Sequence, residues 1–225
     1  MSSTDLLATS VLYQDPWMVA VAKPAGVPVQ PDDTKDRDLL RMTRDLLHDQ
    51  AIDLVHRIDR PVSGVVLFAR DAEALALLHA MFRERKVHKS YWAIVEGVVE
   101  EEQALLEDLL QHDTRAHRAV VGKAPGAKQA RTRVQVLARG DRYALIEARP
   151  EGGAFHQIRA QLGAWGHAIK GDVKYGARRG EKDRSIALHA RSLRFTHPIT
   201  EQAVVIEAPS PPDKLWVALT ASVAG

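Results

Sequence analysis

The segment HRIDRPVSG, residues 56–64, places one carboxylate between two guanidinium groups immediately before an apolar run. Arg57 and Arg60 flank Asp59 in this segment. An aspartate beside opposite charge stays ionised and is held in one orientation, so it can act as a nucleophile or a base. A loop carboxylate that caps its own turn or forms an ordinary ion pair would give the same pattern.

A second group of polar residues occurs further along the chain, in GGAFHQIRAQL, residues 152–162. His156 and Arg159 are three residues apart, so they share one face of a predicted helix. From there Arg159 could bind a carboxylate through two parallel hydrogen bonds, although a surface arginine on an amphipathic helix fits the same pattern. Tyr91 is a third candidate because it begins a β-rich segment behind polar and basic residues. A core or edge tyrosine is the alternative for Tyr91.

The sequence lacks the patterns of several other kinds of site. It contains no cysteine, which excludes disulfides, thiolate nucleophiles and thiolate-bound metals. The histidines show no metal-site spacing, and we expect no bound metal. The glycines match neither a phosphate loop nor a dinucleotide-binding turn. A carboxylate-based site or a pure binding surface remains.

The net charge of the 225 residues is only +2, so the overall charge does not argue for nucleic acid. The distribution is more informative, because segregated charge can form a basic face on a near-neutral protein. Solvated loops and helix faces are the alternative explanation of each cluster. We expect a soluble, cytoplasmic protein, because no apolar stretch could span a bilayer and no secretory signal is present. The main basic stretch contains Arg115, Arg118, Lys123, Lys128, Arg131 and Arg133.

Short strand-like runs separated by turns recur along the chain, with helical spacing in three places. Two hairpins are predicted, one through Gly140-Asp141 and one across His197-Pro198. Consecutive hairpins with a few helices predict an α+β fold, not a parallel doubly wound sheet. The polar stretch 111–128 is expected to be a mobile loop or a small excursion from the sheet. Predicted strands are 11–13, 18–22, 62–69, 91–99, 132–137, 143–148, 186–195 and 203–207; predicted helices are 36–50, one that begins after Asp71, and 156–165 with Gly166 as its C-cap.

These segments resemble, in order, the boxes of RNA pseudouridine synthases of the RluA type. HRIDRPVSG resembles H-R-L-D-x-x-T/V-S-G, and VAKPAGVPV (21–29) resembles the N-terminal K-P-x-G box. KSYWAIVEG (89–97) resembles K-x-Y-x-A-x-V-x-G. FHQIRAQL followed by GHAIKGDVKYG (166–176) resembles H-Q-I-R-x-H-L followed by G-x-P-I-x-G-D-x-x-Y-G. With the closing LHA and HP, the resemblance runs from about residue 10 to residue 210.

The resemblance implies a single pseudouridine synthase catalytic domain over residues 1–225. Its expected core is a mixed, mainly antiparallel and bent β-sheet with flanking helices and an active-site cleft across the sheet. The implied activity is the isomerisation of uridine to pseudouridine in structured ribosomal or transfer RNA, without cofactor or metal. We further expect a monomer, no membrane partner and no N-terminal S4 module.

The resemblance also assigns roles to individual residues. Asp59 matches the catalytic aspartate, Tyr91 the active-site tyrosine, and Arg159 the arginine that pairs with the aspartate. Arg57 matches the arginine that helps to displace the target base. The remaining expected site residues are Arg60 and His56, beside Arg57 for RNA contact and base flipping, and Lys23, His156 and Gln157 as supporting residues.

The chain departs from the family pattern at three places. Gly153-Ala154-Phe155 stands where T-G-R usually precedes the histidine, Gln161 replaces the usual second histidine, and Ala22 stands where Asn is common. The first change affects a loop that we expect to border the RNA, so it bears on substrate choice. Two alternatives remain: a non-catalytic RNA-binding or ribosome-assembly protein on the same scaffold, and a glycoside-type hydrolase, which would need a second carboxylate as acid.

Overall fold

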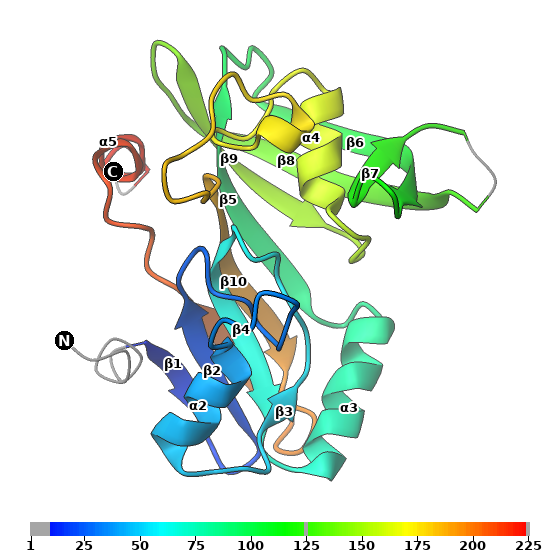
Figure 1. The fold of residues 1–225 in the computed structure, drawn as a ribbon, viewed down its shortest axis with the longest axis vertical. Coiled ribbons are helices and arrows are strands. Elements are labelled where there is room, and N and C mark those ends of the chain that lie inside the picture. Colours follow the sequence, from blue (N-terminus) through cyan, green and yellow to red (C-terminus); the bar gives the residue numbers. More distant parts are fainter. Residues whose placement is uncertain (1–9, 124–125, 224–225) are drawn as a thin grey trace. The chain divides into compact units, whose positions relative to one another are not determined.

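The computed structural model describes residues 10–123 and 126–223, which form an α+β fold (Figure 1). The strand pairings β1–β2, β2–β4, β10–β11, β5–β9, β8–β9, β6–β8 and β6–β7 are all antiparallel. This confirms the α+β prediction. Contacts divide the chain into two compact units: unit 1 is Met1–Lys89 with Ala190–Pro209, and unit 2 is Ser90–His189 with Ser210–Gly225. The expected single domain stays a prediction.

The strands of unit 1 follow the hydrogen-bonded order β1-β2-β4-β10, with β3 paired to β4 and β11 to β10. The hairpin predicted across His197-Pro198 is confirmed as the β10–β11 pair. β2 and β4 lie in a register that puts Lys23 opposite Gly64, at the end of the HRIDRPVSG segment. The bounds are β1 Val11–Gln14, β2 Met18–Lys23, β3 Asp53–Leu54, β4 Ser63–Ala69, β10 Leu188–Thr196 and β11 Ala203–Glu207.

Gly64 fixes how closely β4 and β10 approach. Its φ is +115°, a conformation that side chains rarely adopt, and an added Cβ would lie 2.2 Å from the carbonyl oxygen of Ala190. Any other residue would therefore force the two strands apart. The glycine that ends the HRIDRPVSG segment is thus required by the packing of β4 against β10, a few residues after Asp59 in the sequence.

The helices of unit 1 begin at aspartate N-caps. Asp38 accepts a hydrogen bond from the backbone N–H of Arg41 at the start of α2 (Leu39–Leu47), within the predicted helix 36–50. Asp71 accepts one from Ala74 at the start of α3 (Ala72–Arg83), which confirms the predicted cap. Each cap satisfies an otherwise unpaired N–H and contributes about 1 kcal/mol. The core beneath includes Met18, Leu67, Leu78, Leu193 and Phe195, all buried.

The strands of unit 2 follow the order β5-β9-β8-β6-β7. The hairpin predicted through Gly140-Asp141 is confirmed and is longer than expected. The stretch 111–128 is not only a loop, because it contains β7, which pairs antiparallel with the end of β6. The bounds are β5 His88–Glu96, β6 Gln103–Asp113, β7 Arg118–Val121, β8 Lys128–Arg139 and β9 Tyr143–Pro150.

Helix α4 (Gln157–Ala164) packs against β6, β7, β8 and β9 of unit 2. It ends at Trp165, and Gly166 follows with φ +93°, as expected for a helix that terminates in a left-handed residue. Gly163 allows close contact with the 3-10 helix η1 (Val173–Tyr175), since an added Cβ would lie 2.5 Å from the carbonyl of Tyr175. A further helix, α5 (Lys214–Thr220), was not predicted; it contacts β8 and β9. No helix in the described part of the chain is long and apolar enough to cross a membrane.

Candidate active site

Asp59 lies half-buried in the turn that precedes β4, and its backbone carbonyl accepts a hydrogen bond of 3.0 Å from the N–H of Val62. The turn is joined to the loop after β2 by a hydrogen bond of 2.8 Å from the N–H of Gly26 to the carbonyl of Arg60. Both segments belong to unit 1. The carboxylate is therefore carried on a turn with backbone partners on each side.

Lys23 fixes that turn from beneath. Its side chain is only 1% exposed, and its Nζ donates to the carbonyls of Pro24, Val27 and Arg60 at 3.0, 2.8 and 3.0 Å. Burial lowers the pKa of Lys23 to about 7, while the negative charge of Asp59 acts in the opposite direction. The ammonium group of Lys23 therefore links the loop after β2 to the turn that carries Asp59. Its supporting role in the reaction stays a prediction.

Arg60 is held by acidic and carbonyl groups of its own unit. Its Nε donates to the carbonyl of Gly26 at 2.9 Å, and its Nη1 contacts Asp32 at 3.1 Å. Nη2 also donates to Asp36, and these carboxylates raise the pKa of Arg60. Much of its charge is therefore offset within the protein. Its expected contact with RNA stays a prediction.

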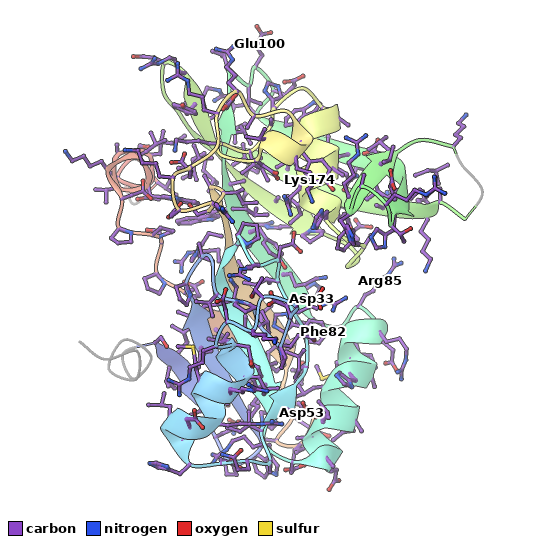
Figure 2. All side chains as sticks on the ribbon, viewed as in Figure 1. Asp33, Asp53, Phe82, Arg85, Glu100 and Lys174 are labelled. Carbon is purple, nitrogen blue, oxygen red and sulfur yellow. The ribbon has the colours of Figure 1, made fainter. Side chains whose placement is uncertain are left out.

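Arg57 and His56 differ in environment although they are adjacent. Arg57 is exposed and forms no hydrogen bond or ion pair with another described residue. The N–H of Leu67 donates to Nε2 of His56 at 3.0 Å, and the imidazole stacks on Phe82, near the C-terminal end of α3 (Figure 2). Burial lowers the pKa of His56 to about 3, with a smaller effect from Lys89. His56 is thus a neutral ring held in place by its own unit.

Tyr91 and Arg159 both lie in unit 2. Tyr91 is half-buried on β5, opposite Ala148 of β9. Arg159 is 5% exposed on α4 and binds Asp172 through two hydrogen bonds, Nε to Oδ2 at 2.6 Å and Nη2 to Oδ1 at 2.9 Å. The two-point contact expected for Arg159 is therefore present on Asp172, a residue that sequence reasoning missed. The pairing of Arg159 with Asp59 stays a prediction.

His156 connects Arg159 to the strands of unit 2. Arg159 Nη1 lies 3.0 Å from His156 Nε2; because arginine only donates, Nε2 is an acceptor and the proton is on Nδ1. Nδ1 then donates to the hydroxyl of Tyr175 at 2.9 Å, which also accepts from the N–H of Ala119 at 2.7 Å. Asp172, Arg159, His156 and Tyr175 form one network that fixes the orientation of the guanidinium group.

Two buried glutamines fasten α4 to the sheet. Gln157 donates to the carbonyl of Arg131 at 3.0 Å and accepts from the N–H of Ala154 at 3.1 Å. Gln161 is 1% exposed; it accepts from the hydroxyl of Thr132 at 2.7 Å and donates to Asp108 at 2.8 Å. Gln161 therefore replaces the usual histidine with a group whose donors and acceptor are satisfied here. Gln157 holds α4 to β8, and its supporting role in the site stays a prediction.

The basic stretch of unit 2 has two parts. Arg131 pairs with Glu107 at 2.6 Å, and Arg133 pairs with Glu151 at 3.0 Å, so both charges are offset across the sheet. The other members are exposed, and we call them the hairpin cations: Arg115, Arg118, Lys123 and Lys128. Among the described residues, no group of histidines and carboxylates could hold a metal ion.

Residues 18–164 match a protein-family model described as RNA pseudouridylate synthase. A tRNA pseudouridine synthase C of Vibrio parahaemolyticus is 33% identical over 219 residues, covering 88% of this chain and 89% of the relative. A ribosomal large subunit pseudouridine synthase C of Vibrio vulnificus is 34% identical over 207 residues, covering 88% of this chain and 65% of the relative. The solved structure of human RNA pseudouridylate synthase domain containing 1 aligns with a TM-score of 0.79 and 26% identity, over 99% of this chain and 89% of that one.

Proposed function

The chain belongs to the RNA pseudouridylate synthase family and is an RNA pseudouridine synthase; we propose that it modifies uridines of ribosomal or transfer RNA through the carboxylate of Asp59. The matched region, residues 18–164, contains Asp59, Tyr91 and Arg159. The observation that carries the proposal is the placement of Asp59 on a turn whose backbone is fixed by the buried ammonium of Lys23. A cytoplasmic, monomeric enzyme is part of the proposal.

The reaction is an isomerisation. The C1′–N1 bond of the uridine breaks, the uracil turns, C5 bonds to C1′, and the proton displaced from C5 is balanced by one gained at N1. No electron is exchanged with another molecule, and no group enters or leaves. The protein must therefore supply a carboxylate at the sugar, a surface for the detached base and charges that hold the RNA. The target uridine must first leave its stack, which costs a few kcal/mol and is cheapest in loops.

Each proposed role follows from the environment of the side chain. Asp59 is proposed to supply the reacting carboxylate, and its charge acts on the buried Lys23 beneath the turn. Arg57 is exposed beside Asp59 and is proposed to occupy the space that the extruded nucleotide leaves. Tyr91 presents a ring against which the uracil can stack, and Arg159 is the proposed partner of the aspartate. Phosphate contacts by the hairpin cations would position the RNA without reading its sequence.

The decisive experiment compares Asp59→Asn with Asp53→Asn. Asp53 is an exposed carboxylate on β3 (Figure 2) whose nearest cation, Arg44, lies 3.9 Å away, so its loss tests charge alone. We expect Asp59→Asn to abolish pseudouridine formation while RNA binding survives, and Asp53→Asn to keep both. Pseudouridines mapped across total RNA from cells with and without the gene would identify the substrate. Comparable activity in the Asp59→Asn enzyme would remove Asp59 from the mechanism.

A further inference from the structure

Three aromatic rings of unit 2 form a continuous stack, and two of them, His112 and Phe155, have no role in the proposed chemistry. Phe155 lies parallel to His156, with ring centroids 3.8 Å apart and an interplanar angle of 17°. His112, near the end of β6, lies on Phe155 with centroids 4.1 Å apart and an angle of 38°. Two rings at these distances could not share one face of Phe155, so Phe155 lies between them. We call His112, Phe155 and His156 the aromatic column.

The inner end of the aromatic column is fixed and its outer end is open. His156 uses both ring nitrogens, accepting from Arg159 at one and bonding Tyr175 at the other. Phe155 is 37% exposed, so the middle ring of the column also reaches the surface. His112 is exposed, and within the described chain its ring contacts no other aromatic ring and its nitrogens form no hydrogen bond. The column therefore runs from the buried arginine of α4 to a free imidazole face.

The sequence of this loop differs from the family pattern where the column forms. Gly153-Ala154-Phe155 stands where T-G-R is usual, so this loop lacks the arginine and Phe155 places a ring beside the histidine. The loop has thus exchanged a charged group for a stacking surface. Arg118 of β7 pairs in register with Asp113, the residue after His112, so an exposed cation lies close to the open end of the column.

We propose that the aromatic column is a stacking platform on which an unpaired nucleobase of the substrate RNA lies against the outer face of His112. The inference rests on the proposed function, because only an RNA substrate supplies such a base. Rings bind the face of any nucleobase, so the platform tolerates sequence while it selects unpaired nucleotides. A neighbouring phosphate would then be within reach of the hairpin cations. The platform thereby adds a preference for loops over duplex RNA.

The experiment uses an RNA hairpin with a uridine loop that carries one 2-aminopurine, a base whose fluorescence is quenched by stacking. The full-length protein is titrated in, and quenching and Kd are both recorded. His112→Asn removes the ring, and we expect the protein-induced quenching to disappear and Kd to rise by about 5-fold or more, the effect of losing one base–aromatic stack. His112→Tyr restores a ring and should recover both signals.

A matched control is His117→Asn. His117 is an exposed histidine in the β6–β7 turn with φ 46°, a conformation that asparagine tolerates, and it belongs to no aromatic stack in the described chain. This variant should bind as the wild type does. The slope of log Kd against log salt should be the same for wild type and His112→Asn, because stacking releases no counterions. A changed slope would indicate an electrostatic role for His112 and would overturn the platform.

The outcomes separate the two claims. If the wild-type protein neither binds the hairpin nor forms pseudouridine in cellular RNA, the proposed function fails and the platform with it. If the wild type binds and modifies RNA but His112→Asn quenches 2-aminopurine as strongly as wild type, only the platform fails. Phe155→Leu is a second test of the column, because it keeps apolar volume but removes the middle ring. It should also weaken the protein-induced quenching of 2-aminopurine.

Discussion

The contact between Arg159 and Asp172 allows a worked prediction. Arg159 is 5% exposed and Asp172 is 2% exposed, and their two hydrogen bonds measure 2.6 and 2.9 Å. Asp172→Ala leaves the buried guanidinium without both oxygens, a loss that costs about 3–5 kcal/mol for a buried pair. In a chain of this size each kcal/mol lowers Tm by about 2–4 °C, so we expect Tm to fall by about 6–20 °C.

The same variant should lose activity, because the guanidinium loses its orientation. Differential scanning calorimetry measures Tm, and a single-turnover assay on an RNA substrate measures the rate. Asp141→Ala, an exposed aspartate in the β8–β9 turn, is the control and should change neither quantity. Asp172→Asn keeps one acceptor oxygen, so its Tm and its rate should lie between those of Asp172→Ala and those of Asp141→Ala.

A double-variant cycle tests the reasoning itself. Arg159→Met with Asp172→Leu removes both charges and fills their volume, so no uncompensated charge remains buried. Its loss of stability should therefore be clearly smaller than the sum of the two single losses, while activity stays low because Arg159 is absent. If the two losses simply add, or if the stability of Asp172→Ala lies within about 1 kcal/mol of the wild type, the buried pair does not hold the guanidinium as argued.

Three further predictions concern acid stability, strand packing and salt. The pKa of His56 in the folded protein, about 3, lies below its ordinary value of 6.5. Neutral His56 therefore contributes stability that is complete above pH 6.5 and is lost as the pH falls towards 3. His56→Gln should flatten the fall of Tm between about pH 6.5 and about pH 4, and an unchanged profile would contradict this. Gly64→Ala should destabilise by about 3 kcal/mol or more in denaturant titrations, whereas Gly122→Ala, with open space around its Cβ and an ordinary φ, should be nearly neutral. Replacing the hairpin cations by glutamine should reduce the slope of log Kd against log salt for RNA binding by up to about 0.9 per charge. Replacing the paired Arg131 and Arg133 should reduce this slope less. Equal reductions would show that the hairpin cations and the paired arginines do not differ in their contact with RNA.

Local sequence signals predicted the elements that local physics determines. Asp71 was recognised as an N-cap because its side chain satisfies the first turn of α3 whatever lies around it. The hairpin at Gly140-Asp141 and the left-handed Gly166 were recognised for the same reason, since turn geometry depends on the residues of the turn. The ordered boxes predicted the family, and the relatives confirm that prediction.

The errors and omissions arise where distant segments meet. The stretch 111–128 was predicted to be a mobile loop or a small excursion from the sheet, and its polar composition gave no sign of β7, which forms by pairing with the end of β6. Arg131 and Arg133 were grouped with free cations, since only the strand register brings Glu107 and Glu151 beside them. Asp172 lies outside one helical turn of Arg159, so helix spacing gave no sign of their contact. The burial of Lys23 is equally invisible to composition, because lysines are mostly exposed.

The backbone turn that carries Asp59 and the guanidinium of Arg159 are each held by neighbours in their own unit. The turn of Asp59 is fixed by Lys23, whose Nζ donates three hydrogen bonds to carbonyls of unit 1. Arg159 is fixed by Asp172 and by His156, which carries the aromatic column. Preorganisation of this kind means that the RNA need not order the turn of Asp59 or the guanidinium of Arg159 when it binds, so more of its binding free energy remains available to extrude the uridine. Arg57 differs, because it is exposed and has no ion-pair partner among the described residues. This suits its proposed task of occupying the space that the nucleotide leaves, since that space exists only after the nucleotide has moved.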